Sequence, residues 1–193
     1  ILLFSTIWII GKELSILSFS TAISFSSEDI FFALFFNIKN IKSKKIWTSN
    51  YKPNNKYQIS FMPDKIEQEM VNDNIKTKIE TIVAPDEPVE IRQVTLENIG
   101  NEEEILEITS YFEPVLSRKE QDYAHQAFNN LFLEYEYDDC NDAIIVKRRK
   151  REKNEQNLYL IAKLQTNIEK IGETEYEISK EKFIGRNNLD IPE

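Results

Sequence analysis

The sequence predicts an all-β fold, an antiparallel β-sandwich. Along several segments hydrophobic residues alternate with polar ones, as they do on a strand that is buried on one face. Turn-forming residues separate these segments at intervals of about ten residues, and few stretches repeat with a helical period. The chain has 193 residues, of which 41% are hydrophobic and 30% are charged. This length and composition suit one globular domain with its own core.

Hydrophobic side chains at every second position indicate where strands lie along the chain. Residues 75–83 form the clearest run, with hydrophobic or Thr side chains at every second position. The run ends at the proline-rich turn 84–88. Alternation or short apolar runs predict further strands, about seven in all, over residues 104–113, 131–137, 143–147 and 158–164.

The run that follows the proline-rich turn changes parity. Val89 and Ile91 share one face of an extended strand, whereas Val94 and Leu96 have the opposite parity. Because one extra residue resets the alternation of a strand, we predict a β-bulge near Gln93 that returns all four side chains to one face.

Residues 109–132 are the most distinctive stretch. The alternating strand before it stops at Pro114, because proline cannot donate to a central ladder. We predict that a polar connection then crosses to a second strand, which begins at residues 124–128. His125 is the only histidine of the chain. We interpret it either as a hydrogen-bonding residue that anchors the crossing or as part of a surface that faces a partner domain or a glycan.

Residues 1–36 differ in composition from the rest of the chain, being apolar and rich in Ser and Phe. Lys12-Glu13 and Glu28-Asp29 interrupt the apolar run, which therefore falls short of the roughly 20 residues that a transmembrane helix needs. The basic start and small-residue cleavage site of a signal peptide are not evident. We expect an atypical segment, mis-joined or membrane-associated, that is irregular or partly helical and packs poorly against an incomplete sandwich domain over residues 37–193.

Composition and residue counts exclude several classes of function. A net charge of -9 argues against a general nucleic-acid binder, because phosphate contacts need a basic face. One His and one Cys supply too few ligands for zinc, so we predict neither a metal site nor a cofactor. Cys140 has no second cysteine to pair with, and we interpret it as an inert turn residue. There is no Gly-x-Ser-x-Gly turn, and we assign no catalytic residue.

Two groups of side chains are of types that bind ligands, namely basic and aromatic residues. Residues 147–153 hold six basic residues in seven, and an arginine such as Arg149 makes planar, bidentate contacts to phosphate or carboxylate. The competing interpretation is an exposed hairpin that balances nearby acids. Sugar binding uses aromatic faces, although aromatic residues at strand spacing more often belong to a core. The aromatic residues available for it are Trp47, Tyr51, Tyr57, Tyr111, Phe112, Tyr123, Phe128, Tyr135, Tyr137 and Phe183.

Four segments together carry a family resemblance. They are residues 109–132, which include Ala124-His125-Gln126-Ala127-Phe128, the basic run Lys147-Arg148-Arg149-Lys150-Arg151, the segment Phe183-Ile184-Gly185-Arg186, and residues 36–47. Along the sequence these segments follow one another as they do in a known family. The chain, from about Phe36 to Pro192, resembles the N-terminal β-sandwich or supersandwich domain of glycoside hydrolase family 94, formerly glycosyltransferase family 36. The resemblance implies a galactose-mutarotase-like sandwich. Cellobiose phosphorylases and cyclic β-1,2-glucan synthases belong to that family, and the synthases are the closer likeness.

The chain departs from the family pattern in two loops and before the first shared motif. The family usually has Pro where Gln126 stands and a second Gly-Arg pair where Asn187 and Asn188 stand. A family segment rich in Arg, Trp and Asp precedes the motif Phe-x-Ile-x-x-x-x-Ser-Gly-Lys-x-Trp, whereas this chain has its apolar segment there. The motif corresponds to residues 36–47, Phe-Asn-Ile-Lys-Asn-Ile-Lys-Ser-Lys-Lys-Ile-Trp.

The resemblance implies a non-catalytic, carbohydrate-binding or supporting module, of which this chain is a fragment, in a β-glucan synthase or phosphorylase. In such an enzyme an (α/α)6 catalytic barrel follows, and the partners are β-glucan or oligosaccharide and inorganic phosphate, with a homodimer also allowed. We expect a cytoplasmic location or the cytoplasmic face of a membrane. The rival interpretations are a purely structural or oligomerisation sandwich and a nonfunctional, truncated remnant. The implied site residues, which face a glycan or a neighbouring domain, are His125, Arg149, Gly185 and Arg186.

Overall fold

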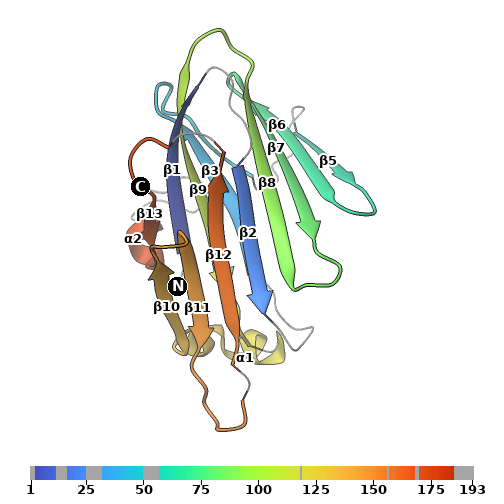
Figure 1. Ribbon diagram of the computed structural model, residues 1–193, viewed down its shortest axis with the longest axis vertical. Helices are drawn as coiled ribbons and strands as arrows, with labels where there is room; N and C mark the ends of the chain where they lie inside the picture. Colours follow the sequence, from blue (N-terminus) through green and yellow to red (C-terminus); the bar gives the residue numbers. More distant parts are fainter. Residues whose placement is uncertain are drawn as a thin grey trace.

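The computed structural model is a sandwich of two antiparallel β-sheets, which confirms the predicted fold class (Figure 1). Within the residues that the structure describes, the chain forms thirteen strands and two helices. The expectation of about seven strands was therefore too low. The described ranges are residues 3–11, 17–24, 32–49, 57–117, 119–155, 157–167 and 170–184.

The two sheets differ in size. In spatial order, the five-stranded sheet consists of β13 (Glu175–Glu177), β1 (Leu3–Gly11), β9 (Glu104–Pro114), β3 (Phe32–Asn40) and β4 (Ile46–Thr48). The eight-stranded sheet consists, in its own order, of β10 (Leu133–Asp138), β11 (Ala143–Arg148), β12 (Tyr159–Thr166), β2 (Leu17–Ser24), β8 (Val89–Asn98), β7 (Ile75–Val83), β6 (Ile66–Asn72) and β5 (Tyr57–Phe61). Helix α1 (Lys119–Asn130) lies between β9 and β10 in the sequence, and α2 (Lys180–Ile184) follows β13.

The expectation that residues 1–36 are irregular or partly helical was wrong. Strand β1 pairs along its whole length with β9, from Leu3 opposite Phe112 to Gly11 opposite Glu104. Strand β2 lies between β12 and β8, inside the eight-stranded sheet, and β3 also pairs with β9. Strand β1 and the first half of β3 are nearly continuous apolar runs, which a strand shares with other buried structures. Strand β2, in contrast, alternates apolar with polar residues, so the pattern that indicates it was present in the sequence.

The β-bulge predicted near Gln93 is absent from β8. One register holds along the whole pairing with β7, from Ile75 opposite Asn98 to Val83 opposite Glu90, and the pairing with β2 is equally regular. The apolar residues of β8 therefore do lie on both faces of the strand. Val94 and Leu96 point into the core, whereas Ile91 lies on the opposite face of the sheet, across from Ile82.

The core lies between the two sheets. The five-stranded sheet contributes Phe36, Ile38, Trp47, Leu106, Ile108 and Phe112. The eight-stranded sheet contributes Met70, Ile75, Ile79, Val94, Leu96, Leu133, Ile144, Val146, Leu160, Ala162 and Leu164. Because buried apolar surface is the main favourable contribution to folding, this shared layer holds the two sheets together.

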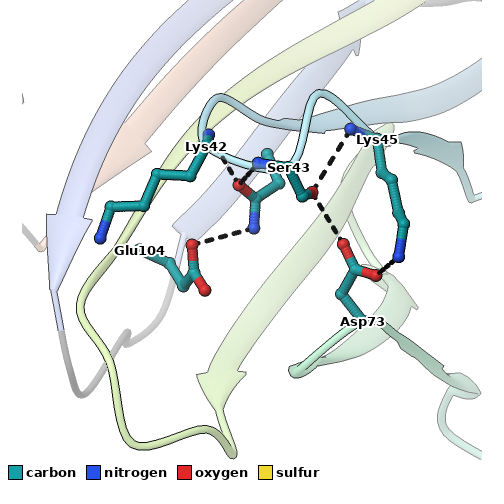
Figure 2. Close-up of polar contacts among 6 residues, drawn as sticks. Lys42, Ser43, Lys45, Asp73 and Glu104 are labelled. Atoms are coloured by element: carbon teal, nitrogen blue, oxygen red, sulfur yellow. Dashed lines mark hydrogen bonds and ion pairs between the residues drawn. The ribbon is translucent and has the colours of Figure 1, made fainter.

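A polar contact joins one turn of each sheet, as Figure 2 shows. In the β3–β4 turn, the Asn40 side-chain oxygen accepts hydrogen bonds from the backbone N–H groups of Lys42 and Ser43, at 2.9 and 3.0 Å. The Ser43 hydroxyl donates to the carboxylate of Asp73 at 2.8 Å, and Lys45 forms an ion pair with the same carboxylate. Asp73 belongs to the β6–β7 turn, so the contact links the two sheets.

Lys44, at the tip of the β3–β4 turn, has a left-handed backbone with φ 57°. This is the position at which the family motif has Gly, the residue that adopts positive φ without steric cost. We therefore expect Lys44→Gly to raise the free energy of unfolding by about 0.5–1 kcal/mol. Urea denaturation would measure the change. Lys44→Ala removes the charge but keeps the strain, so it should change stability little, and equal effects of the two variants would contradict the conformational explanation.

Candidate functional site

The segment that carries His125 is a helix, so the strand predicted to begin at residues 124–128 was wrong. Strand β9 ends at Pro114 as predicted, and α1 follows with Glu120 and Asp122 in its first turn, where acidic residues favour a helix N-terminus. His125 interrupts the helix, with φ -154° and ψ 64°. A run this short does not distinguish a strand from a helix by its pattern.

The surface of α1 carries exposed apolar and aromatic side chains. Tyr123 is 81% exposed and Phe128 is 45% exposed, while Leu131, next to the end of the helix, is 70% exposed. The predicted site residue His125 is also exposed on this helix. We call these four residues, together with Arg149 and Arg151, the α1 surface.

Arg149 is tied to the end of α1 through Phe132. Its backbone N–H donates to the Phe132 carbonyl at 2.8 Å, and its guanidinium carbon lies 5.6 Å from the centre of the Phe132 ring. The guanidinium carbon of Arg151 lies 5.2 Å from the centres of both the Phe128 and Phe132 rings. Cation–π contacts of this kind contribute about 0.5–1 kcal/mol at exposed sites. Arg149 and Arg151 thus lie at the C-terminal end of the helix that bears His125.

The neighbouring Arg148 is less exposed than Arg149. Its guanidinium carbon lies 5.5 Å from the centre of the Phe132 ring. Burial lowers the pKa of Arg148, and the positive charge of Arg151 acts in the same direction. An arginine keeps its charge even so, because its ordinary pKa is so high. The ring of Phe132 therefore packs against a cluster of permanent positive charges.

The first half of α1 lies close to the end of β9. The Tyr111 hydroxyl donates to the Glu113 carboxylate at 2.5 Å, and burial raises the pKa of Tyr111, with the Glu113 contact adding to it. Burial also raises the pKa of Asp122, and the charge of Glu113 acts in the same direction. The effect of Glu113 on Asp122 is that of a like charge nearby, and we assign the two carboxylates no catalytic role.

Other sequence predictions have a simpler outcome. Gly185 and Arg186 lie outside the described residues, so their expected place on a surface that faces a glycan or a neighbouring domain stays a prediction. Cys140 is exposed in the β10–β11 turn. Among the described residues, no group of His, Cys, Asp and Glu is arranged to hold a metal ion. None of the helices that the structure describes has the length and apolar character needed to cross a membrane.

Comparison with known proteins shows which family the chain is similar to. The family model described as "Glycosyl hydrolase 94, supersandwich domain" matches residues 33–191. The chain is 31% identical over 134 residues to the cyclic beta-(1,2)-glucan synthase NdvB of Rhizobium meliloti (strain 1021). The match covers 69% of this chain and 5% of that protein, so the chain spans only a small part of its relative. The chain belongs to the glycoside hydrolase family 94 supersandwich domains.

Proposed function

We propose that the chain is a non-catalytic, supporting β-sandwich module of a glycosyl-transferring enzyme, a β-glucan synthase or phosphorylase. Its membership of family 94 and its similarity to a glucan synthase support this assignment. In the proposal the module packs against the catalytic part of the enzyme. The catalytic part acts on β-glucan, and the module contributes no reacting group of its own.

One observation carries the proposal, namely the exposed apolar and aromatic side chains of the α1 surface. Large apolar groups in water have an unfavourable free energy, and patches of them bordered by polar residues mark contact surfaces. Aromatic and arginine side chains are also enriched at protein interfaces. Tyr123, Phe128 and Leu131 supply the apolar part and Arg149 and Arg151 the polar border.

The predicted site residues fit the border of this contact. His125 and Arg149 are both exposed, and both belong to the α1 surface. An arginine there offers a fork of donors to a carboxylate, a phosphate or a backbone carbonyl. We propose the same role for Gly185 and Arg186, on the strength of the family resemblance alone.

The test replaces Leu131 with Ser in the enzyme that carries this module. Glucosyl transfer should fall about fivefold, as for the loss of one well-packed interface side chain. The thermal midpoint of the isolated chain should change by no more than about 2 °C, because Leu131 is exposed there. The isolated chain itself should turn over neither cellobiose nor sophorose, with or without phosphate.

Phe61→Ser is the matched control, since Phe61 is 79% exposed at the end of β5, in another part of the fold. It should leave both the activity and the midpoint unchanged. Full activity of the Leu131 variant would remove the α1 surface from the contact. Self-association of the isolated chain that Leu131→Ser abolishes would favour the oligomerisation sandwich instead.

A further inference from the structure

A cavity opens between the edge strands of the two sheets, away from the α1 surface. Strand β10 is the last strand of the eight-stranded sheet and β13 the last of the five-stranded sheet, and the two lie near each other on one side of the sandwich (Figure 1). The cavity has a volume of about 320 Å³, which is at the lower end of the range of small-molecule sites. Its lining residues are Tyr135, Glu136, Tyr137, Ile144, Tyr176, Glu177 and Ile178.

The cavity contains a flat aromatic platform. The rings of Tyr137 and Tyr176 stack at 3.9 Å between centroids, with 22° between their planes, although they come from different sheets. Tyr176 remains 48% exposed. The stack hides one face of each ring and leaves Tyr176 partly exposed, and the free face of an aromatic ring is a surface on which the apolar face of a pyranose ring packs.

Hydrogen bonds hold this platform in place. The Tyr137 hydroxyl donates to one oxygen of the Asp142 carboxylate, in the β10–β11 turn. Lys170 donates to the other oxygen at 3.0 Å and to the Thr174 hydroxyl at 2.7 Å. Lys170 and Thr174 lie just before β13, so these bonds fix Tyr176 against Tyr137 without a ligand. A preorganised platform costs little conformational entropy when a ligand binds.

Polar groups of the cavity are suited to sugar hydroxyls. The hydroxyl of Tyr135 is buried and has no hydrogen-bond partner among the described residues, an arrangement that costs about 1–3 kcal/mol. Glu177 also lines the cavity, and a carboxylate is a hydrogen-bond acceptor. One flat apolar surface with a hydrogen-bond acceptor beside it is the complement of a pyranose.

The arrangement is less suited to an organic cation, the other ligand that tyrosines and carboxylates attract. A cation is bound by several ring faces directed toward it, whereas Tyr137 and Tyr176 direct one face each toward the other. The ammonium group of Lys170 also lies in the network that supports the platform, where it opposes a second positive charge.

We propose that the cavity between β10 and β13 binds a glucosyl unit of a β-glucan, which stacks on the exposed face of Tyr176. This inference rests on the proposed function for the choice of β-glucan, but it concerns a different surface from the α1 surface. The module would thereby hold the glucan chain at a distance from the catalytic part of the enzyme.

The test titrates the 193-residue chain with sophorose and with a linear β-1,2-gluco-oligosaccharide, monitored by NMR chemical shifts and calorimetry. We expect millimolar binding, and weakening by about tenfold in Tyr176→Ala. Tyr176→Phe keeps the ring and should retain most of the affinity. Tyr135→Phe should change binding little, because the Tyr135 hydroxyl is buried and a ligand in the cavity does not reach it. Tyr123→Ala, on the α1 surface, is the matched control and should bind as the unchanged chain does.

The outcomes separate this inference from the proposed function. No glucan binding by the chain, or equal binding by Tyr176→Ala, would overturn the cavity site while leaving the α1 surface untouched. Binding of choline in place of glucan would overturn it as well. If Tyr176→Ala fails to fold, Tyr176→Leu decides, because it keeps a large apolar side chain but removes the aromatic face, and it should still weaken glucan binding.

Discussion

Deleting residues 1–24 is expected to abolish the cooperative unfolding of the chain. The deletion removes β1 and β2, which lie inside the two sheets and not at their edges. Without β2, the edges of β8 and β12 lose their partners, and without β1 the strands β9 and β13 lose theirs. Unpaired backbone groups and an opened core both disfavour the folded state.

Circular dichroism during thermal unfolding would measure this effect, with the full chain as the reference. Thr21→Pro gives a second, less drastic variant. Thr21 pairs with Ala162 on one side and Glu90 on the other, and proline inside a central strand removes a ladder hydrogen bond. A shortened chain that still unfolds cooperatively at an unchanged midpoint would show that these strands contribute nothing to the sandwich.

The Ile108→Ala variant is expected to lose about 2–5 kcal/mol of stability. Ile108 has no exposed surface and lies in β9, between Ile7 of β1 and Ile38 of β3. The loss combines the transfer of the removed carbon atoms with the cavity that they leave in a closely packed layer. Urea denaturation of the isolated chain would give the value.

Ile99→Ala is the control for this measurement. Ile99 follows β8 directly and is 54% exposed, so its truncation should change the free energy of unfolding by less than about 0.5 kcal/mol. Losses of similar size in the two variants would mean that β9 does not occupy the centre of the core.

Strands with one buried face could be predicted from the sequence, because their alternation is visible in the residues themselves. Residues 75–83 and 104–113 predicted β7 and β9 closely. The apolar runs of β1 and β3 could not be assigned, since such a run also suits other structures, whereas β2 alternates and could have been predicted. Helix α1 was missed for a related reason, because its non-helical His125 leaves two pieces too short for a recognisable period.

The candidate site could be predicted only in part. The basic residues around Arg149 were visible, but their packing on Phe132 depends on how α1 meets β10, which no local pattern reports. Alternation placed Tyr135 and Tyr137 on one face of a strand. The partner of Tyr137, Tyr176, comes from a short edge strand of the other sheet, and only the tertiary structure brings the two rings together.

The central position of β2 has a consequence for the order of events during synthesis. Its two neighbours, β8 and β12, follow it at long intervals in the chain, and Ser24 finds its partner only at Tyr159. Contacts between residues so far apart slow folding. The eight-stranded sheet therefore cannot close until β12 has left the ribosome, and until then β2 exposes a hydrogen-bonding edge to other nascent chains.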